Sequence, residues 1–147
     1  MTEAEVVKTL REHFEGLFPK VCPKCNRCFP TLREYILITK RLGPSISYDA
    51  ELGDWNPLRP IGSVALANCP CGTTLALGTE GMPLPQRLLL LTWVRIETQR
   101  RGLSPTELLD YLRTVQLALI HCTPRPIPLR VVIREQGRLR RRYPFRP

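Results

Sequence analysis

The sequence predicts an α+β protein that combines a small antiparallel sheet with four helices. Three helix-like segments each begin with a hydroxyl residue followed three positions later by glutamate, which is the pattern of a capping box. Short runs that favour β structure lie on both sides of a cysteine turn at residues 69–72. Closely spaced cysteines occur there and again at residues 22–28, so the two turns are candidates for one shared site.

The first two helices are predicted over residues 3–18 and 32–42. Thr2 precedes the first, and its apolar side chains recur at three- and four-residue spacing up to Pro19. Thr31 precedes the second, directly after the first cysteine turn. Gly43 and Pro44 together form a strong stop signal, so this helix is expected to end at about Leu42.

The middle of the chain changes to a two-residue period. Ile46 and Tyr48 alternate with polar residues, and residues 61–67 and 73–77 read as the two strands of a hairpin with a metal knuckle at its tip. Asp49, Glu51 and Asp54 lie in a turn-rich segment and lack the remaining ligands of a calcium loop, so a solvated turn is expected.

A C-terminal helical hairpin is predicted over residues 85–101 and 105–120, because the connection at Gly102 is only three residues long. Proline at positions 124, 126 and 128 then ends the helical pattern, and residues 129–133 are compatible with an edge strand. We therefore expect an α+β metal-binding domain at 1–123 and an extended Pro/Arg-rich basic tail at 124–147.

The cysteines carry the main chemical signal. Cys22, Cys25, Cys69 and Cys71 form two proline-containing turns, and a turn of this kind presents two thiolates to one metal ion. Gly72 permits a positive φ, which lets backbone N–H groups point at the sulfurs. The predicted cofactor is one structural Zn²⁺ that pins the small sheet.

Other uses of the cysteines remain open. Cys28 is a possible spare ligand or a small apolar residue, and Cys122 beside His121 lacks a matching half-site. Cys22, Cys25 and Cys28 begin like a ferredoxin motif, but position 32 is leucine, so an iron–sulfur cluster is a lesser alternative. Dithiol redox chemistry is another, although a helix precedes the first turn where a thioredoxin-like motif would open one.

Residues 21–28 and 68–72 resemble the cysteine turns of zinc-ribbon and zinc-knuckle modules. Asn26 stands where such turns usually carry glycine, and the second turn is one residue short. The resemblance implies a structural metal ion and often a role in binding nucleic acid or protein, and it implies no particular activity.

The net charge of +9 is concentrated at the C-terminal end. Residues 125–147 hold eight arginines and one glutamate, whereas the rest of the chain has 14 basic and 12 acidic side chains. Arginine forks match phosphate oxygens, and aromatic rings stack on exposed bases. The candidate anion-binding and nucleic-acid-binding residues are Arg134, Arg138, Arg140, Arg141, Arg142, Tyr143, Phe145 and Arg146.

These features favour a binding protein over an enzyme. No P-loop, nucleophile elbow or zinc-deaminase signature occurs, and four thiolates would close the metal shell. The leading hypothesis is a structural-zinc module that binds nucleic acid through its tail. The alternative is a non-enzymatic adaptor that docks on an acidic protein surface. Neither a secretory signal nor a membrane span is visible, so a cytoplasmic location is expected.

Overall fold

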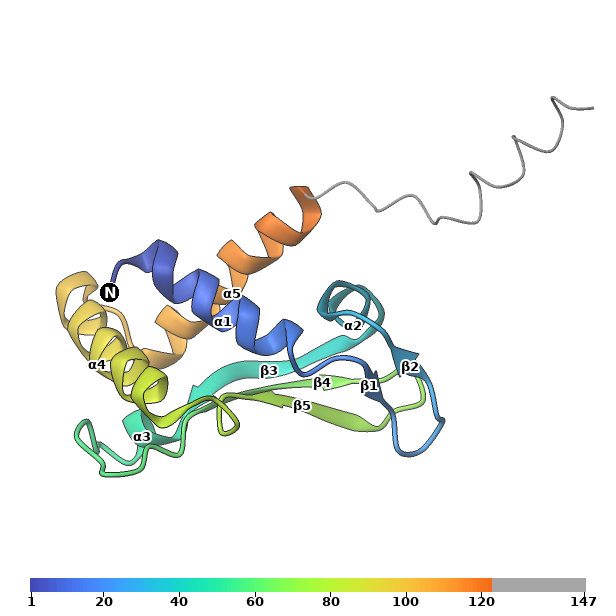
Figure 1. Cartoon of the computed structure of the whole chain (residues 1–147), viewed down its shortest axis with the longest axis horizontal. Helices are drawn as coiled ribbons and strands as arrows, with labels where there is room; N and C mark the ends of the chain where they lie inside the picture. The colour runs from blue at the N-terminus through green and yellow to red at the C-terminus, as the bar shows by residue number, and fades with distance from the viewer. Residues whose placement is uncertain (123–147) are drawn as a thin grey trace, which may run out of the picture.

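The computed structural model describes the backbone of residues 1–122 and, up to residue 119, their side chains. It shows an α+β fold with an N-terminal helix, two small antiparallel sheets and two long C-terminal helices, as predicted (Figure 1). The elements in chain order are α1 Glu3–Glu15, β1 Lys20–Val21, β2 Cys28–Phe29, α2 Leu32–Ile38, β3 Lys40–Ser47, α3 Tyr48–Glu51, β4 Ser63–Asn68, β5 Thr74–Gly78, α4 Leu84–Arg101 and α5 Pro105–Cys122.

The predicted helix starts are confirmed by their hydrogen bonds. Thr2 and Glu5 form a complete capping box, and Ser104 and Glu107 form another. Thr31 accepts a hydrogen bond from the Glu34 N–H at the start of α2. Each cap satisfies backbone donors that the first helical turn would otherwise leave unpaired.

The second helix is shorter than predicted, because the structure ends α2 at Ile38 and continues as strand β3. The β-branched residues at its end favour the extended backbone that follows. Gly43 and Pro44 lie inside this strand at a register irregularity between Leu42 and Ile46, where Gly43 adopts φ +70°. The bulge admits a proline without breaking a regular ladder.

The larger sheet has the strand order β3–β4–β5, and helices α1, α2 and α5 lie over one of its faces (Figure 1). The hairpin of β4 and β5 is confirmed, with Ala65 opposite Leu77 and Ala67 opposite Leu75. The smaller sheet pairs β1 with β2 near the turn that joins β4 to β5 (Figure 1).

The buried side chains form two clusters. The helical core joins α1, α4 and α5 through residues that include Val6, Trp93 and Leu108. The cysteine-side core joins α2, the larger sheet and the first cysteine turn through residues that include Phe29 and Tyr35. Phe14 packs against both clusters and links them.

The predicted solvated turn is wrong for Asp49. This side chain is buried, and its two carboxylate oxygens accept hydrogen bonds from the N–H groups of Ile61 and Gly62 at 2.8 Å each. A buried carboxylate needs such donors to offset the loss of water. Asp49 therefore closes the long connection between α3 and β4.

Candidate metal centre

The first cysteine turn connects β1 to β2. The Cys22 N–H donates to the Arg27 carbonyl at 2.9 Å, and the Asn26 N–H donates to the Cys22 carbonyl at 3.0 Å. Asn26 adopts φ +56°, a left-handed conformation that asparagine tolerates better than most other residues. Asn26 therefore adopts a left-handed conformation that glycine takes most readily.

The second cysteine turn connects β4 to β5 and repeats this design. The Cys69 N–H donates to the Thr73 carbonyl at 2.9 Å, and the Gly72 N–H donates to the Cys69 carbonyl at 2.8 Å. Gly72 has φ +88°, as its position in the sequence predicts. Both turns are therefore held by backbone hydrogen bonds that fix where the cysteine side chains project.

The two turns bring four sulfur atoms together. The Sγ atoms of Cys22, Cys25, Cys69 and Cys71 all lie within 4.8 Å of one another, and the Cys22–Cys71 and Cys25–Cys69 pairs are each 3.6 Å apart. All four cysteines are free, as these separations require, since a disulfide joins sulfurs at about 2.05 Å. A tetrahedral ion with Zn–S bonds of about 2.3 Å would place its sulfurs about 3.8 Å apart. The arrangement fits one mononuclear metal ion.

The four thiols differ in their electrostatic environments. The Thr73 hydroxyl and backbone hold the pKa of Cys71 down at about 6, and the backbone N–H of Cys25 contributes most to lowering that of Cys22. For Cys69, the backbone hydrogen bond from Cys71 lowers the pKa, but burial and the neighbouring sulfurs outweigh it and raise the pKa to about 12. Thiols this close do not all ionise without a positive ion among them.

The site is half-buried at the edge of the cysteine-side core. Cys22 and Cys69 are buried, Cys71 is intermediate and Cys25 is exposed. Phe29 packs in the same cluster as the two buried cysteines. The apolar packing on one side restricts the access of water to the sulfur atoms. A hydrophobic shell of this kind lowers the local dielectric constant and favours bonds between thiolates and a metal ion.

The remaining predicted site residues lie outside this cluster or outside the part of the chain that the structure describes. Cys28 begins strand β2, is exposed and is not among the four clustered cysteines. The side chains of His121 and Cys122 and all of the tail candidates from Arg134 to Arg146 lie beyond the described side chains. Their proposed roles stay predictions.

One residue of the site was missed by sequence reasoning. The Thr73 hydroxyl oxygen lies 3.3 Å from Cys71 Sγ, within hydrogen-bond distance of the thiol. The sequence signal for this contact is a threonine two positions after a candidate ligand. Hydroxyl side chains at such short spacings commonly form hydrogen bonds with groups close in the sequence.

Comparison of the chain with protein-family models, with curated proteins and with solved structures finds no match in any of the three. Within residues 1–122, none of the helices has the length and apolar character needed to cross a bilayer.

Proposed function

We propose that this chain is a structural-zinc module that binds nucleic acid through its arginine-rich tail. The observation that carries the metal assignment is the clustering of four reduced cysteine sulfurs within 4.8 Å of one another. Zinc prefers a tetrahedral shell of thiolates, and four of them leave no open position for substrate or water. The ion would therefore stabilise the fold and take no part in catalysis.

The position of the site explains what zinc would hold together. Cys22 and Cys25 come from the turn of the β1–β2 hairpin, and Cys69 and Cys71 come from the turn of the β4–β5 hairpin. Neither hairpin is long enough to be stable alone. One ion would bind both turns, and a reducing compartment such as the cytoplasm would keep the thiols available for it.

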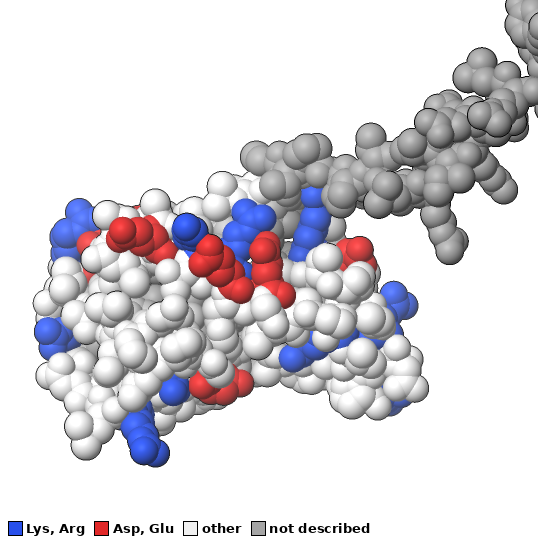
Figure 2. Space-filling view, viewed as in Figure 1, with Lys and Arg blue, Asp and Glu red and all other residues white. Residues whose placement is uncertain are grey.

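The proposed nucleic-acid contact rests on the distribution of charge. Residues 1–124 are nearly neutral, with 14 basic and 12 acidic side chains, whereas residues 125–147 carry eight arginines and one glutamate. On the face in Figure 2, basic and acidic groups are interspersed and separated by uncharged areas. The tail is therefore the strongest candidate for attracting a polyanion.

Metal analysis of protein purified without added metal tests the first half of the proposal. We expect one zinc ion per chain in the wild type and in Cys28→Ser, and we expect no stoichiometric metal in Cys69→Ser. Loss of a structural ion costs on the order of 10 kcal/mol in small zinc modules, so Cys69→Ser should also lose the near-ultraviolet signal of the cysteine-side core, to which Tyr35 belongs. Iron in place of zinc, or full metal content in Cys69→Ser, would refute the assignment.

Salt titration of binding to single-stranded RNA and duplex DNA tests the second half. If five phosphates are neutralised, log K should fall against log salt with a slope of roughly −3.5 to −4.5. Replacing Arg138, Arg140, Arg141, Arg142 and Arg146 with alanine should flatten that slope and leave zinc content unchanged. Unaltered binding by this variant would refute the tail assignment. Saturable binding to one acidic protein, without competition by polyanions, would instead support an adaptor.

A further inference from the structure

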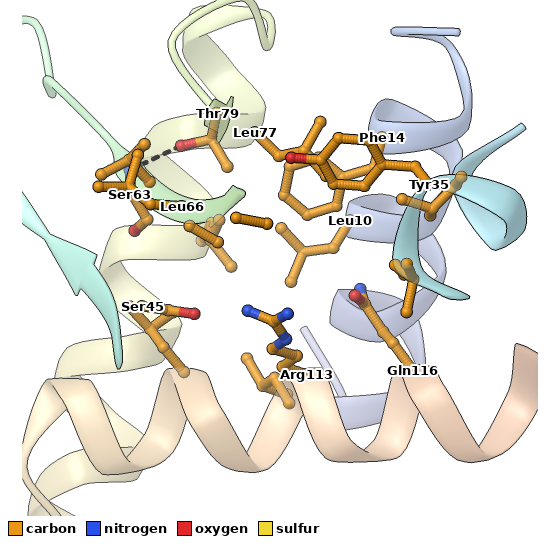
Figure 3. A pocket seen from close by; sticks show the side chains of 18 residues that line it. Leu10, Phe14, Tyr35, Ser45, Ser63, Leu66, Leu77, Thr79, Arg113 and Gln116 are labelled. Atoms are coloured by element: carbon orange, nitrogen blue, oxygen red, sulfur yellow. Dashed lines mark hydrogen bonds between the residues drawn. The ribbon is translucent and has the colours of Figure 1, made fainter. Parts of the chain in front are cut away.

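A cavity of about 80 Å³ lies where the helical core meets the cysteine-side core (Figure 3). Its walls draw on both clusters, with Leu10 and Leu112 from the first and Tyr35 and Leu77 from the second. Phe14, which packs on both cores, also lines it. One water needs roughly 10–15 Å³ on this scale, so the space holds roughly five to eight groups of that size, enough for most of a medium-length alkyl chain.

Two polar side chains from α5 point into this apolar cavity, namely Arg113 and Gln116 (Figure 3). Gln116 Nε2 is fully buried and has no hydrogen-bond partner among the described residues. A buried amide donor without an acceptor is costly, and native proteins rarely leave one unpaired. The cavity therefore presents a donor that calls for an acceptor from a ligand.

Arg113 is a partly buried cation without a bonded counter-ion among residues 1–119. Burial is the main reason that its pKa is lowered. The neighbouring carboxylate of Asp110 is already engaged, because it pairs with Arg41 and accepts a hydrogen bond from the Ser45 N–H. An anionic group in the cavity would supply the negative counter-charge for Arg113. A guanidinium binds a carboxylate with two parallel hydrogen bonds.

We propose that this cavity binds a medium-chain monocarboxylate, with its carboxylate on Arg113 and Gln116 and its alkyl chain against Leu10, Phe14 and Leu77. The apolar walls would exclude a strongly hydrated polyanion. The arginine-rich tail is a poor occupant, since it would bring further positive charge to Arg113. The proposal uses neither a zinc ligand nor a tail arginine, so it stands or falls independently of the proposed function.

Calorimetric titration of the folded full chain, as purified, with octanoate tests this site. We expect saturable one-to-one binding at neutral pH, at least tenfold weaker binding of octanol, and no binding of octylammonium, because only the carboxylate complements Arg113. Shortening the ligand from octanoate to butanoate should weaken binding by about fourfold for each methylene removed. Absence of octanoate binding to the folded wild type would overturn the proposal.

Three variants locate the binding. Arg113→Met keeps much of the side-chain length and should weaken octanoate binding at least tenfold while changing octanol binding less than twofold. Arg59→Met is the control, at an exposed loop arginine, and should leave the binding of both ligands unchanged. Ala65→Leu adds bulk on the strand residue opposite Leu77 and should abolish binding of both ligands. If Arg113→Met fails to fold, Gln116→Leu tests the carboxylate contact instead and should weaken octanoate binding more than octanol binding. Octanoate binding that survives Ala65→Leu, or that disappears only in the tail-alanine variant, would place the ligand elsewhere and refute the site.

Discussion

Glu97 on α4 accepts hydrogen bonds from Arg100 and Arg101, and Arg101 also pairs with Glu3 on α1. Tyr111 on α5 donates to the other oxygen of Glu3 at 2.8 Å, and the Arg101 guanidinium lies 5.1 Å from the centre of its ring. This small network ties three helices together at one end of the helical core.

The hydrogen bond from Arg100, followed by that from Arg101, holds the pKa of Glu97 at about 2, well below its usual value of 4.5. A carboxyl group whose pKa is depressed in the folded state stabilises the protein above its unfolded pKa and loses that contribution as pH falls toward the folded one. We therefore expect Glu97→Gln to lower the denaturant midpoint at pH 7 and the deficit to shrink as pH falls from about 4.5 toward 2.

Unfolding curves of the two proteins at each pH give this difference directly, and acid-driven loss of metal affects both proteins alike. Glu12→Gln is the control, because the Glu12 side chain forms an exposed ion pair with Lys8 at 3.9 Å and should change the midpoint little at any pH. A Glu97→Gln deficit that stays constant from pH 7 to 3 would contradict the pKa argument.

Gly62, at the end of the connection between α3 and β4, lies where both the backbone conformation and the neighbouring atoms disfavour a side chain. Its φ is +102°, and a Cβ placed there would lie 2.5 Å from Thr79 Oγ1. That oxygen already accepts a hydrogen bond from the Ser63 N–H at 2.8 Å, so it has little freedom to move.

We expect Gly62→Ala to destabilise the protein by about 1–3 kcal/mol through backbone strain, with the clash added. Gly53→Ala is the matched control, because Gly53 also has positive φ, +72°, but nothing lies within 4 Å of its Cβ position. Urea unfolding should show a clearly larger loss for Gly62→Ala. Equal losses would mean that the contact with Thr79 contributes nothing.

The elements that could be predicted from the sequence are those whose signals are local. Capping residues at the starts of α1 and α5, and Gly102 at the end of α4, predicted these helices to within a few residues. These signals are local, because each depends only on the backbone of its own turn. The first part of strand β3, residues 40–44, was missed, because Tyr35, Ile36, Ile38 and Leu42 carry a helical period, whereas the strand is fixed by pairing with β4, far along the chain.

The candidate site shows the same division. The four clustered cysteines were predicted because zinc ligands recur at fixed short spacings, and the structure brings these four together. Asp49 was wrongly expected to be solvated. Its burial depends on the N–H groups of Ile61 and Gly62, and no short-range sequence pattern reveals these partners. The cavity has no sequence signature, because it arises where two separately packed cores meet.

At the scale of the whole molecule, the metal centre belongs to one of the two cores. Cys22 and Cys69 are part of the cysteine-side core, whereas the helical core contains no residue from either cysteine turn. We therefore expect removal of zinc by a chelator to open the two parts unequally.

Hydrogen exchange followed by mass spectrometry checks this expectation. After chelation, amides of the two cysteine turns, at residues 22–29 and 68–74, should lose protection by orders of magnitude, and amides around Leu108 in α5 should lose far less. Restoring zinc should reverse the change. Uniform loss of protection across both parts would show instead that the described chain unfolds as one cooperative unit.

The separation of the two cysteine turns along the chain also sets an order of events during synthesis. Cys25 and Cys69 are 44 positions apart, and at roughly 5–20 residues per second the second turn leaves the ribosome on the order of seconds after the first. Throughout that interval Cys22, Cys25 and Cys28 form an open three-thiol segment that can take up a metal ion or be oxidised. We therefore expect translation speed and the redox state of the surroundings to determine together how much of the newly made chain brings its four clustered cysteines together in reduced form.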